Sequence, residues 1–336
     1  MDKDEIMDHP FSKSVSAAEK IKKLFSTVNT DDAVAVLINA DPDALSSAMA
    51  LKRILWRKVR KTNIYRINVI KRADNLAMVK LLKVDHQHIR SLNAAEVTRW
   101  AIVDSQPNHN TLFGKYRFDI IIDHHPPAPS IDAPYVDIRE DYGATSTLMI
   151  EYLRAAKIKP SPRLATALFY GIKTDTENFA RPTAERDIKA FRYLYPYVNT
   201  HIIKKIESSE FTKQSLARFR DALDRYEIIR NRAFVHMGTV KDPDVLVMIA
   251  DFFLKVAEAS WSIVSGVYGQ KLIVIFRNAG FRRDAGKAAD EIFGKLGTAG
   301  GHKSAARAEV PLQNLEIAVE DEKAVAEFVQ KRIRNM

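Results

Sequence analysis

Acidic side chains and two histidines follow apolar segments of this sequence at four places, and these residue types suit metal chemistry. The residues are Asp41, Asp43, Asp104, Asp123, His124, His125 and Asp175. Gathered at one place, so many like charges repel one another unless a cation neutralises them, because burying unpaired carboxylates is costly. Carboxylate plus imidazole without thiolate favours Mn²⁺ or a similar divalent ion, and the chain has no cysteine. Two such ions sharing one aspartate could clamp a phosphoryl group and activate a water molecule.

The elements expected to position these residues are the strands of a parallel sheet. Apolar runs at 33–38, 100–103 and 118–122 are typical of buried strands, and the run 168–172 is either a strand or the end of a helix. Helical patterns lie between them, and strands that alternate with helices imply a mostly parallel sheet with helices on both faces. Such sheets bind ligands at the carboxyl ends of their strands, where the topology changes direction. We therefore expect the acidic residues to meet at that edge.

The pattern changes after residue 183. Two charged helical segments without strands follow, and strand-like runs return at 233–237, 261–268 and 271–276, with helical patterns between them. This order predicts a helical connector and then a second α/β domain.

The 336-residue chain has a net charge of +10, and the charge is unevenly distributed. Nine basic residues and no acidic residue lie between Lys52 and Arg72. A basic block of this kind indicates either a surface for a polyanion or a solvated helix face. The apolar stretches are too short for a membrane span, and acidic residues near the N-terminus do not fit a signal peptide, so we expect a cytoplasmic protein with no membrane partner.

The segment Ile121-Ile-Asp-His-His125 resembles the motif after which the DHH phosphoesterase family is named. Residues 39–47, 103–105 and 171–176 resemble three further motifs of that family, in the same order. Residues 299–306 resemble the glycine-rich signature of the companion DHHA1 domain. The chain is similar to the small two-domain members, which include nanoRNase/pAp phosphatases, and it is related to RecJ-like proteins.

The resemblance implies an α/β fold with two domains. The N-terminal DHH domain, a doubly wound and mostly parallel sheet that binds the metals, would cover 1–185. A helical connector would cover 186–230, and a smaller C-terminal α/β DHHA1 domain that binds substrate would cover 231–336.

The resemblance also implies a role for each residue of the first motifs. Asp41 would bind the first metal and Asp43 the second, while Asp104 would bridge both ions. His124 and Asp175 would complete the second site. Asp123 would orient His124 through its other ring nitrogen, and His125 would contact the scissile phosphate or protonate the leaving group.

Two further features concern the substrate and the first metal. The resemblance implies that Arg277, Gly300, Gly301 and His302 bind substrate phosphate from the second domain. The first metal site departs from the family pattern, since Leu37 and Asn39 stand where family members place a histidine or an aspartate. Asn39 offers only a carbonyl oxygen, so we expect weaker binding at that site.

The sequence thus predicts a hydrolase that uses two divalent cations, Mn²⁺ before Mg²⁺ or Co²⁺. Its substrates would be phosphate esters of short oligoribonucleotides, linear dinucleotides or pAp. The alternatives are an inorganic pyro- or polyphosphatase, or a non-catalytic nucleotide or nucleic-acid binding protein. The basic block at 52–72 could steer phosphates, and a homodimer is compatible with the resemblance. The other histidines, including His109, follow no metal-ligand spacing.

Overall fold

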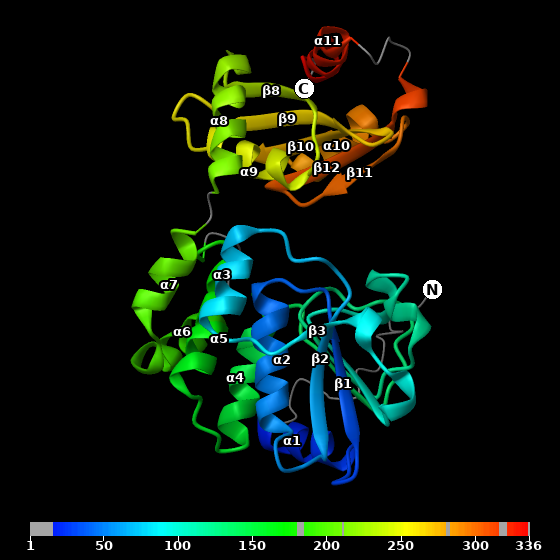
Figure 1. Cartoon of the computed structure of the whole chain (residues 1–336), viewed down its shortest axis with the longest axis vertical. Helices are drawn as coiled ribbons and strands as arrows, with labels where there is room; N and C mark the ends of the chain where they lie inside the picture. The colour runs from blue at the N-terminus through cyan, green and yellow to red at the C-terminus, as the bar shows by residue number, and fades with distance from the viewer. Residues whose placement is uncertain (1–15, 180–184, 210–211, 280–282, 316–320, 335–336) are drawn as a thin grey trace, which may run out of the picture. The chain divides into compact units, whose positions relative to one another are not determined.

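The computed structural model describes residues 16–179, 185–209, 212–279, 283–315 and 321–334. The chain divides into two compact units, residues 1–210 and 211–336, and each has its own sheet and hydrophobic core (Figure 1). The division falls inside the stretch predicted as a helical connector. Helices on its N-terminal side belong to the first unit, and those on its C-terminal side belong to the second.

The first unit is built on a parallel sheet of six strands in the order β3-β2-β1-β4-β5-β6. The strands are β1 (Ala33–Ile38), β2 (Lys61–Arg66), β3 (Gln87–His88), β4 (Arg99–Val103), β5 (Ile120–Asp123) and β6 (Tyr135–Ile138). From β1, strands β2 and β3 are added on one side of the sheet, and β4, β5 and β6 are added on the other side. The topology therefore changes direction between β1 and β4, which pair directly. The predicted α/β class and parallel N-terminal sheet are confirmed, and the switch point lies where ligand sites form in such sheets.

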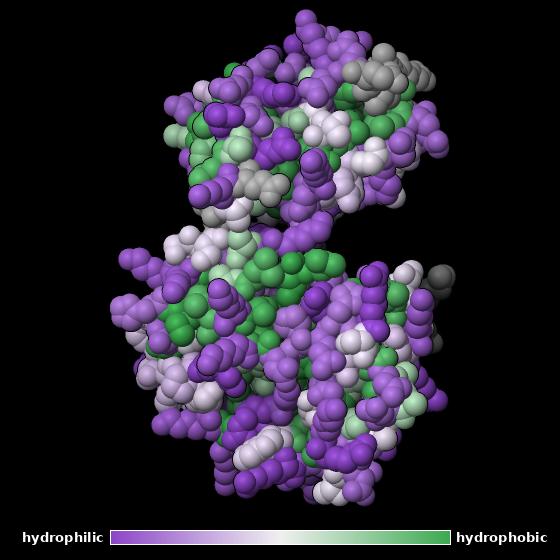
Figure 2. All heavy atoms as spheres, viewed as in Figure 1, coloured by the Kyte–Doolittle hydropathy of each residue, from purple (hydrophilic) through white to green (hydrophobic). Residues whose placement is uncertain are grey.

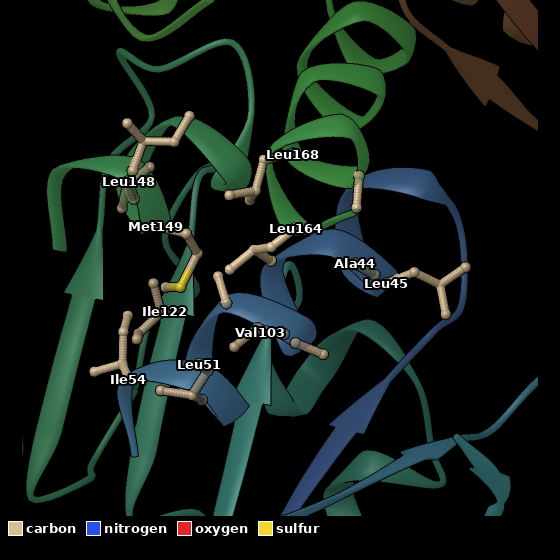
Figure 3. Close-up of a cluster of buried hydrophobic side chains, with 14 of the residues drawn as sticks. Ala44, Leu45, Leu51, Ile54, Val103, Ile122, Leu148, Met149, Leu164 and Leu168 are labelled. Atoms are coloured by element: carbon tan, nitrogen blue, oxygen red, sulfur yellow. The ribbon is translucent and has the colours of Figure 1, made fainter. Parts of the chain in front are cut away.

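Helices cover one face of this sheet. They include α1 (Ala17–Ser26), α2 (Pro42–Ile54), α4 (Thr145–Ala155) and α5 (Pro162–Asp175). Leu45 and Leu51 of α2, Met149 of α4 and Leu168 of α5 gather over Val103 and Ile122 of the sheet (Figure 3). A second apolar cluster fills the other face. There the cover comes from loops and the short 3₁₀ helices η1 (Ile89–Ser91), η2 (Ala94–Glu96), η3 (Pro107–His109) and η4 (Phe113–Lys115).

The apolar run 168–172 lies inside α5 and is therefore helical. Ser161 caps the start of this helix by accepting a hydrogen bond from the Leu164 backbone, and Pro162 occupies the first turn, where a missing N–H costs nothing. The helix ends at Asp175 and so delivers this carboxylate from a helix end. The remaining helices of the unit are α3 (Ala73–Leu81), α6 (Glu185–Leu194), η5 (Tyr195–Tyr197) and α7 (Thr200–Glu207).

The second unit has a mostly antiparallel sheet with the order β11-β12-β10-β9-β8-β7, in which β8 and β9 pair in parallel. Its strands are β7 (Glu227–Ile229), β8 (Arg232–Thr239), β9 (Trp261–Tyr268), β10 (Lys271–Asn278), β11 (Thr298–Gly301) and β12 (Ala305–Pro311). Its helices are α8 (Lys213–Arg225), α9 (Asp244–Phe253), α10 (Ala285–Phe293), η6 (Leu312–Asn314) and α11 (Glu322–Ile333). This arrangement confirms the predicted second, smaller α/β domain.

On the face seen in Figure 2, hydrophilic side chains surround a contiguous hydrophobic area on the first unit. The exposed large apolar side chains include Trp56 and Tyr195, which expose 56% and 60% of their surface. None of the helices in the described ranges is long and apolar enough to cross a membrane.

Candidate metal centre

Four of the predicted metal ligands come together beyond the carboxyl ends of the strands of the first unit. Asp104 follows β4, and His124 follows β5. His124 Nε2 lies 3.0 Å from Asp175 Oδ2 and 3.5 Å from Asp104 Oδ1. Ligand atoms of Asp43, His124 and Asp175 lie within 4.8 Å of one another, as do those of Asp104, His124 and His125. Two overlapping groups of potential metal ligands therefore share His124.

The N-terminus of α4 holds two of these carboxylates in place. The backbone N–H groups of Thr145 and Ser146 donate to the two oxygens of Asp43, at 2.6 and 2.8 Å. The Thr145 hydroxyl donates to Asp104 Oδ1 at 2.9 Å. The first N–H groups of a helix have no partner within the helix, and the helix dipole favours negative charge there. Thr145 and Ser146 were not identified from the sequence, although their small polar side chains open a predicted helix.

A glycine brings Asp175 to the cluster. A Cβ atom at Gly171 would lie 2.4 Å from Ser46 Oγ and 2.6 Å from Ser146 Oγ. The hydroxyls of Ser46 and Ser146 themselves lie 2.6 Å apart. Any side chain at Gly171 would therefore push α5 away from α2 and α4. Since Asp175 follows one helical turn later, this close approach sets its distance from Asp43 and His124.

His124 has the orientation of a metal ligand. Its Nδ1 lies 3.1 Å from the Tyr142 carbonyl oxygen, so an Nδ1–H can donate there and leave Nε2 facing the carboxylates. Nε2 is buried and makes no hydrogen bond of ordinary geometry with the described residues. A buried ring nitrogen among carboxylate oxygens is a donor set that suits Mn²⁺ and similar ions. The residues present therefore fit a divalent cation.

Burial and neighbouring charges shift the pKa values of several residues of the site. Burial, with the charges of Asp43 and Asp41 adding to it, raises the pKa of Asp104 well above its usual range. Burial, with the charges of Asp43 and Asp175 adding to it, also raises the pKa of Asp41 to about 7. Burial alone lowers the pKa of His124, but the adjacent carboxylates of Asp175 and Asp43 outweigh it and raise this pKa to about 9. These groups therefore favour their protonated forms at neutral pH.

Metal binding should consequently release protons and tighten as the pH rises. The ion needs a neutral His124 and ionised carboxylates, so protons must leave groups whose pKa values lie near 9 and 7. We expect Mn²⁺ affinity to increase steadily between pH 6 and 9. Titration calorimetry in buffers of different ionisation enthalpy would count the protons released. An affinity that does not change over this range would contradict the assignment of His124 as a ligand.

Asp123 has a different partner from the one expected. It was predicted to orient His124, but its Oδ1 lies 2.8 Å from Nδ1 of His125. Its other oxygen accepts a 2.6 Å hydrogen bond from Gln106. Burial alone raises the pKa of Asp123, but the hydrogen bonds from His125 and Gln106 outweigh it and lower this pKa. Asp123 therefore stays ionised and fixes the ring of His125.

Gln106 and His109 are two further site residues that the sequence did not predict. The Gln106 amide is fully buried, donates also to the Pro126 carbonyl oxygen at 3.0 Å, and accepts from the Ala128 backbone at 2.7 Å. The ring of His109 meets that of His125 edge-on, with centroids 5.4 Å apart. Ligand atoms of His109, Asp123 and His125 lie within 4.8 Å of one another. No local spacing reveals these contacts, because they join residues of different loops.

Fewer metal-binding side chains stand at the positions expected to hold the first metal. Asp41 caps α2, and its Oδ1 accepts a 2.9 Å hydrogen bond from the Ala44 backbone. Asn39 is exposed, and Leu37 is fully buried in the apolar cluster on the other face of the sheet. Neither of these two residues brings an imidazole or a carboxylate to the cluster.

The predicted substrate-binding residues lie near one another within the second unit. Arg277 of β10 pairs in register with Ala305 of β12, and its Nε donates to Asp251 Oδ1 of α9 at 2.5 Å. Gly301 has a φ of 153°, and a Cβ there would lie 2.3 Å from the Ala305 carbonyl oxygen, so a side chain is excluded. A Cβ on Gly300 would meet open space, and His302 is exposed. Arg277 is thus already paired with a carboxylate, while the two glycines end β11 and His302 follows them as an exposed residue.

An aspartate–histidine cluster beyond the switch point of this parallel sheet places potential metal ligands where such sheets bind ligands. Residues 33–172, which make up most of the first unit, match the model of the DHH family, N-terminal domain. An uncharacterized protein of Methanocaldococcus jannaschii is 33% identical over 298 residues, which are 88% of this chain and 61% of that protein. A probable manganese-dependent inorganic pyrophosphatase of Deinococcus radiodurans is 25% identical over 183 residues, 53% of this chain and 57% of that one. The chain thus spans about three fifths of the length of these relatives.

Solved structures share the fold. A crystal structure of an exopolyphosphatase-related protein from Bacteroides fragilis has a TM-score of 0.73 at 16% identity. The matched region is 97% of this chain and 98% of that protein's chain. The structure of RecJ from Thermus thermophilus, in complex with Mn²⁺, has a TM-score of 0.54 at 14% identity and covers 95% of this chain and 54% of its own. At these identities the likeness describes the fold.

Proposed function

We propose that this chain is a metal-dependent phosphoesterase that hydrolyses phosphate ester bonds of short oligoribonucleotides, linear dinucleotides or pAp. The observation that carries the proposal is the cluster of Asp43, Asp104, His124 and Asp175, with His125 beside it. The match to the DHH family and the manganese-dependent relative support the same chemistry.

The residues of the site would have two different roles in such a reaction, metal binding and proton transfer. The four clustered side chains, with Asp41, would hold up to two divalent cations. When bound, these ions supply charge stabilisation at phosphoryl oxygens and acidify water. His125 would act in proton transfer. Asp123 contacts its Nδ1, so the other ring nitrogen can donate a proton to the leaving oxygen.

A direct assay tests the proposal. The purified chain is incubated with Mn²⁺ and a labelled dinucleotide, beside the double variant His124→Ala/Asp175→Ala. We expect hydrolysis by the unmodified chain and a loss of at least about 100-fold in the variant, since changes behind the ligands alone cost 10–100-fold. The matched control is His88→Ala/Asp85→Ala, which removes a histidine and an aspartate of the same unit outside the cluster and should keep full activity. Equal rates in both double variants would refute the proposal.

An inorganic substrate is the second candidate. The pyrophosphatase relative favours it, because that protein aligns with more than half of this chain. Phosphate release from pyrophosphate or polyphosphate, together with intact dinucleotide, would select this alternative. The same assay with each substrate at equal concentration separates the two.

A non-catalytic binding role is the third hypothesis. The buried Leu37 and the exposed Asn39 favour it, because they stand where the first metal site was expected to have its ligands. A chain that binds Mn²⁺ and nucleotide but releases no product from any of these substrates would have kept the site and lost turnover. Metal stoichiometry adds to this test, since the hydrolytic proposal expects two ions per chain and a degraded first site expects one.

A further inference from the structure

An exposed tryptophan lies among uncompensated positive charges in the turn between α2 and β2. Trp56 exposes 56% of its surface, and Arg57, Lys58, Arg60 and Lys61 after it are also exposed. The other tryptophans are more enclosed: Trp261 exposes 7%, and Trp100 stacks on Tyr116. The segment 53–61 is called the Trp56 turn below.

The charge of the larger basic block is concentrated in this turn. Lys52 pairs with Asp85 at 2.8 Å, and Arg72 pairs with Asp74 at 2.8 Å, so both ends of the block are neutralised. Among the described residues, no ion pair within 4.0 Å involves the five cations of the turn, which are Arg53, Arg57, Lys58, Arg60 and Lys61. Their excess charge is available to an anionic partner.

The cations are arranged around aromatic rings. The Arg57 guanidinium lies 4.3 Å from the centroid of the Trp56 ring, and that of Arg53 lies 4.9 Å from it. Lys58 Nζ lies 4.8 Å from the ring of Phe25 in α1. Because both guanidinium groups lie over the indole, a base that stacks on Trp56 displaces one of them, and the displaced guanidinium can bind a phosphate of the same strand.

The backbone supports a role for the Arg57 side chain. Arg57 has a φ of 63°, in the left-handed region that favours glycine. A non-glycine residue there strains the chain, and such strain is common where a side chain has a function. Here the residue with positive φ places its guanidinium closer to the Trp56 ring centroid than Arg53 does, at 4.3 Å against 4.9 Å.

The turn is too far from the metal cluster to hold the reacting phosphate. Asp41 and Asp43 stand at the N-terminus of α2, whereas Arg53 is in its last turn. The helix between them is about 18 Å long at 1.5 Å per residue. The cations of the turn therefore do not contact the scissile phosphate.

We propose that the Trp56 turn is a binding surface for single-stranded nucleic acid, with a base stacked on Trp56 and phosphates on the surrounding arginines and lysines. The exposed ring selects this partner over inorganic polyphosphate, which has no base to stack. The surface is independent of the proposed hydrolysis, because binding here uses no residue of the metal cluster.

The test measures binding of the full chain to a fluorescein-labelled 12-nucleotide oligouridylate by anisotropy, in EDTA so that no metal-dependent cleavage occurs. Trp56→Ala is expected to weaken binding about 10-fold, since stacking of one base on an aromatic ring accounts for roughly 5- to 150-fold. Arg57→Gly is expected to weaken binding several-fold and to lower the slope of log K against log salt by about 0.7, the value for one phosphate contact on a single strand. Its melting temperature should not fall, because glycine suits a positive φ.

Arg192 of α6 and Tyr195 of η5 give matched controls, because both are exposed and lie in the same unit. Arg192→Ala and Tyr195→Ala should each leave the affinity within a factor of two. Inorganic polyphosphate should compete with an affinity that Trp56→Ala does not change. Unchanged oligonucleotide binding by the folded Trp56→Ala and Arg57→Gly variants would overturn the proposal, and so would an equal loss of polyphosphate affinity in Trp56→Ala.

Discussion

Asp104→Asn is expected to make the metal-free protein more stable and to abolish metal-dependent hydrolysis. Asp104 is buried beside other carboxylates, and its raised pKa shows that its negative charge is unfavourable there. Asparagine keeps an oxygen for the Thr145 hydroxyl and tolerates the positive φ of 58° at this position. We expect a gain of about 1 kcal/mol, or about 2–4 °C for a domain of this size, in EDTA. Activity should fall at least about 100-fold.

Thermal unfolding with and without Mn²⁺ measures both effects. The unmodified chain should gain stability with increasing Mn²⁺, because a ligand that binds only the folded state stabilises it by mass action. The variant should start higher and gain much less. Asp85→Asn is the control, since Asp85 lies outside the cluster and is paired with Lys52 on the surface. A lower melting temperature for Asp104→Asn than for Asp85→Asn in EDTA would contradict the repulsion described for the site.

Asp137→Ala is expected to be the most destabilising single substitution discussed for the first unit. Asp137 of β6 and Lys20 of α1 expose only 3% and 5% of their side chains, and Lys20 Nζ lies 3.0 and 2.9 Å from the two carboxylate oxygens. Arg139 Nε donates to the same carboxylate at 2.7 Å, and the Tyr152 hydroxyl also donates to it. Removal of Asp137 leaves the Lys20 ammonium buried without this counter-charge, at a cost of about 3–5 kcal/mol.

Urea unfolding of the full chain, followed by circular dichroism, would measure this loss. Asp85→Ala breaks an ion pair of similar length that is largely exposed, since 79% of the Asp85 side chain is accessible. That variant should lose at most about 1 kcal/mol. Lys20→Met combined with Asp137→Leu should recover only part of the loss, because it removes the buried ammonium but leaves Arg139 without its carboxylate partner. A loss for Asp137→Ala no larger than for Asp85→Ala would show that the pair is not effectively buried.

Local patterns were enough to predict the main strands and most of the cluster. β1, β4 and β5 are central strands of a parallel sheet, buried on both faces, so each appears in the sequence as a continuous apolar run. The polar residue that follows such a run must then lie at the carboxyl edge. This reasoning predicts Asp104 and His124 as residues of that edge.

Contacts between loops could not be predicted in the same way. Asp123 and His124 are neighbours in sequence, but successive side chains of an extended segment point to opposite sides, and Asp123 contacts His125 instead. The backbone donors of Thr145 and the amide of Gln106 act on residues far away in the sequence, and periodicity carries no information on such pairs. The strands β11 and β12 were also missed, because their glycine- and alanine-rich sequences have little preference for strands.

The close contact at Gly171 separates the metal ligands into two pairs that differ in how firmly they are held. Asp43 and Asp175 belong to helices that touch through Ser46, Ser146 and Gly171, so neither can shift without moving the core beneath it. Asp104 and His124 come from strand ends, and among the described residues their side chains contact Thr145 Oγ1 and the Tyr142 carbonyl oxygen through one hydrogen bond each. Ions of different radius would therefore be accommodated mainly by rotation of these two side chains, while Asp43 and Asp175 keep the position that the helices impose.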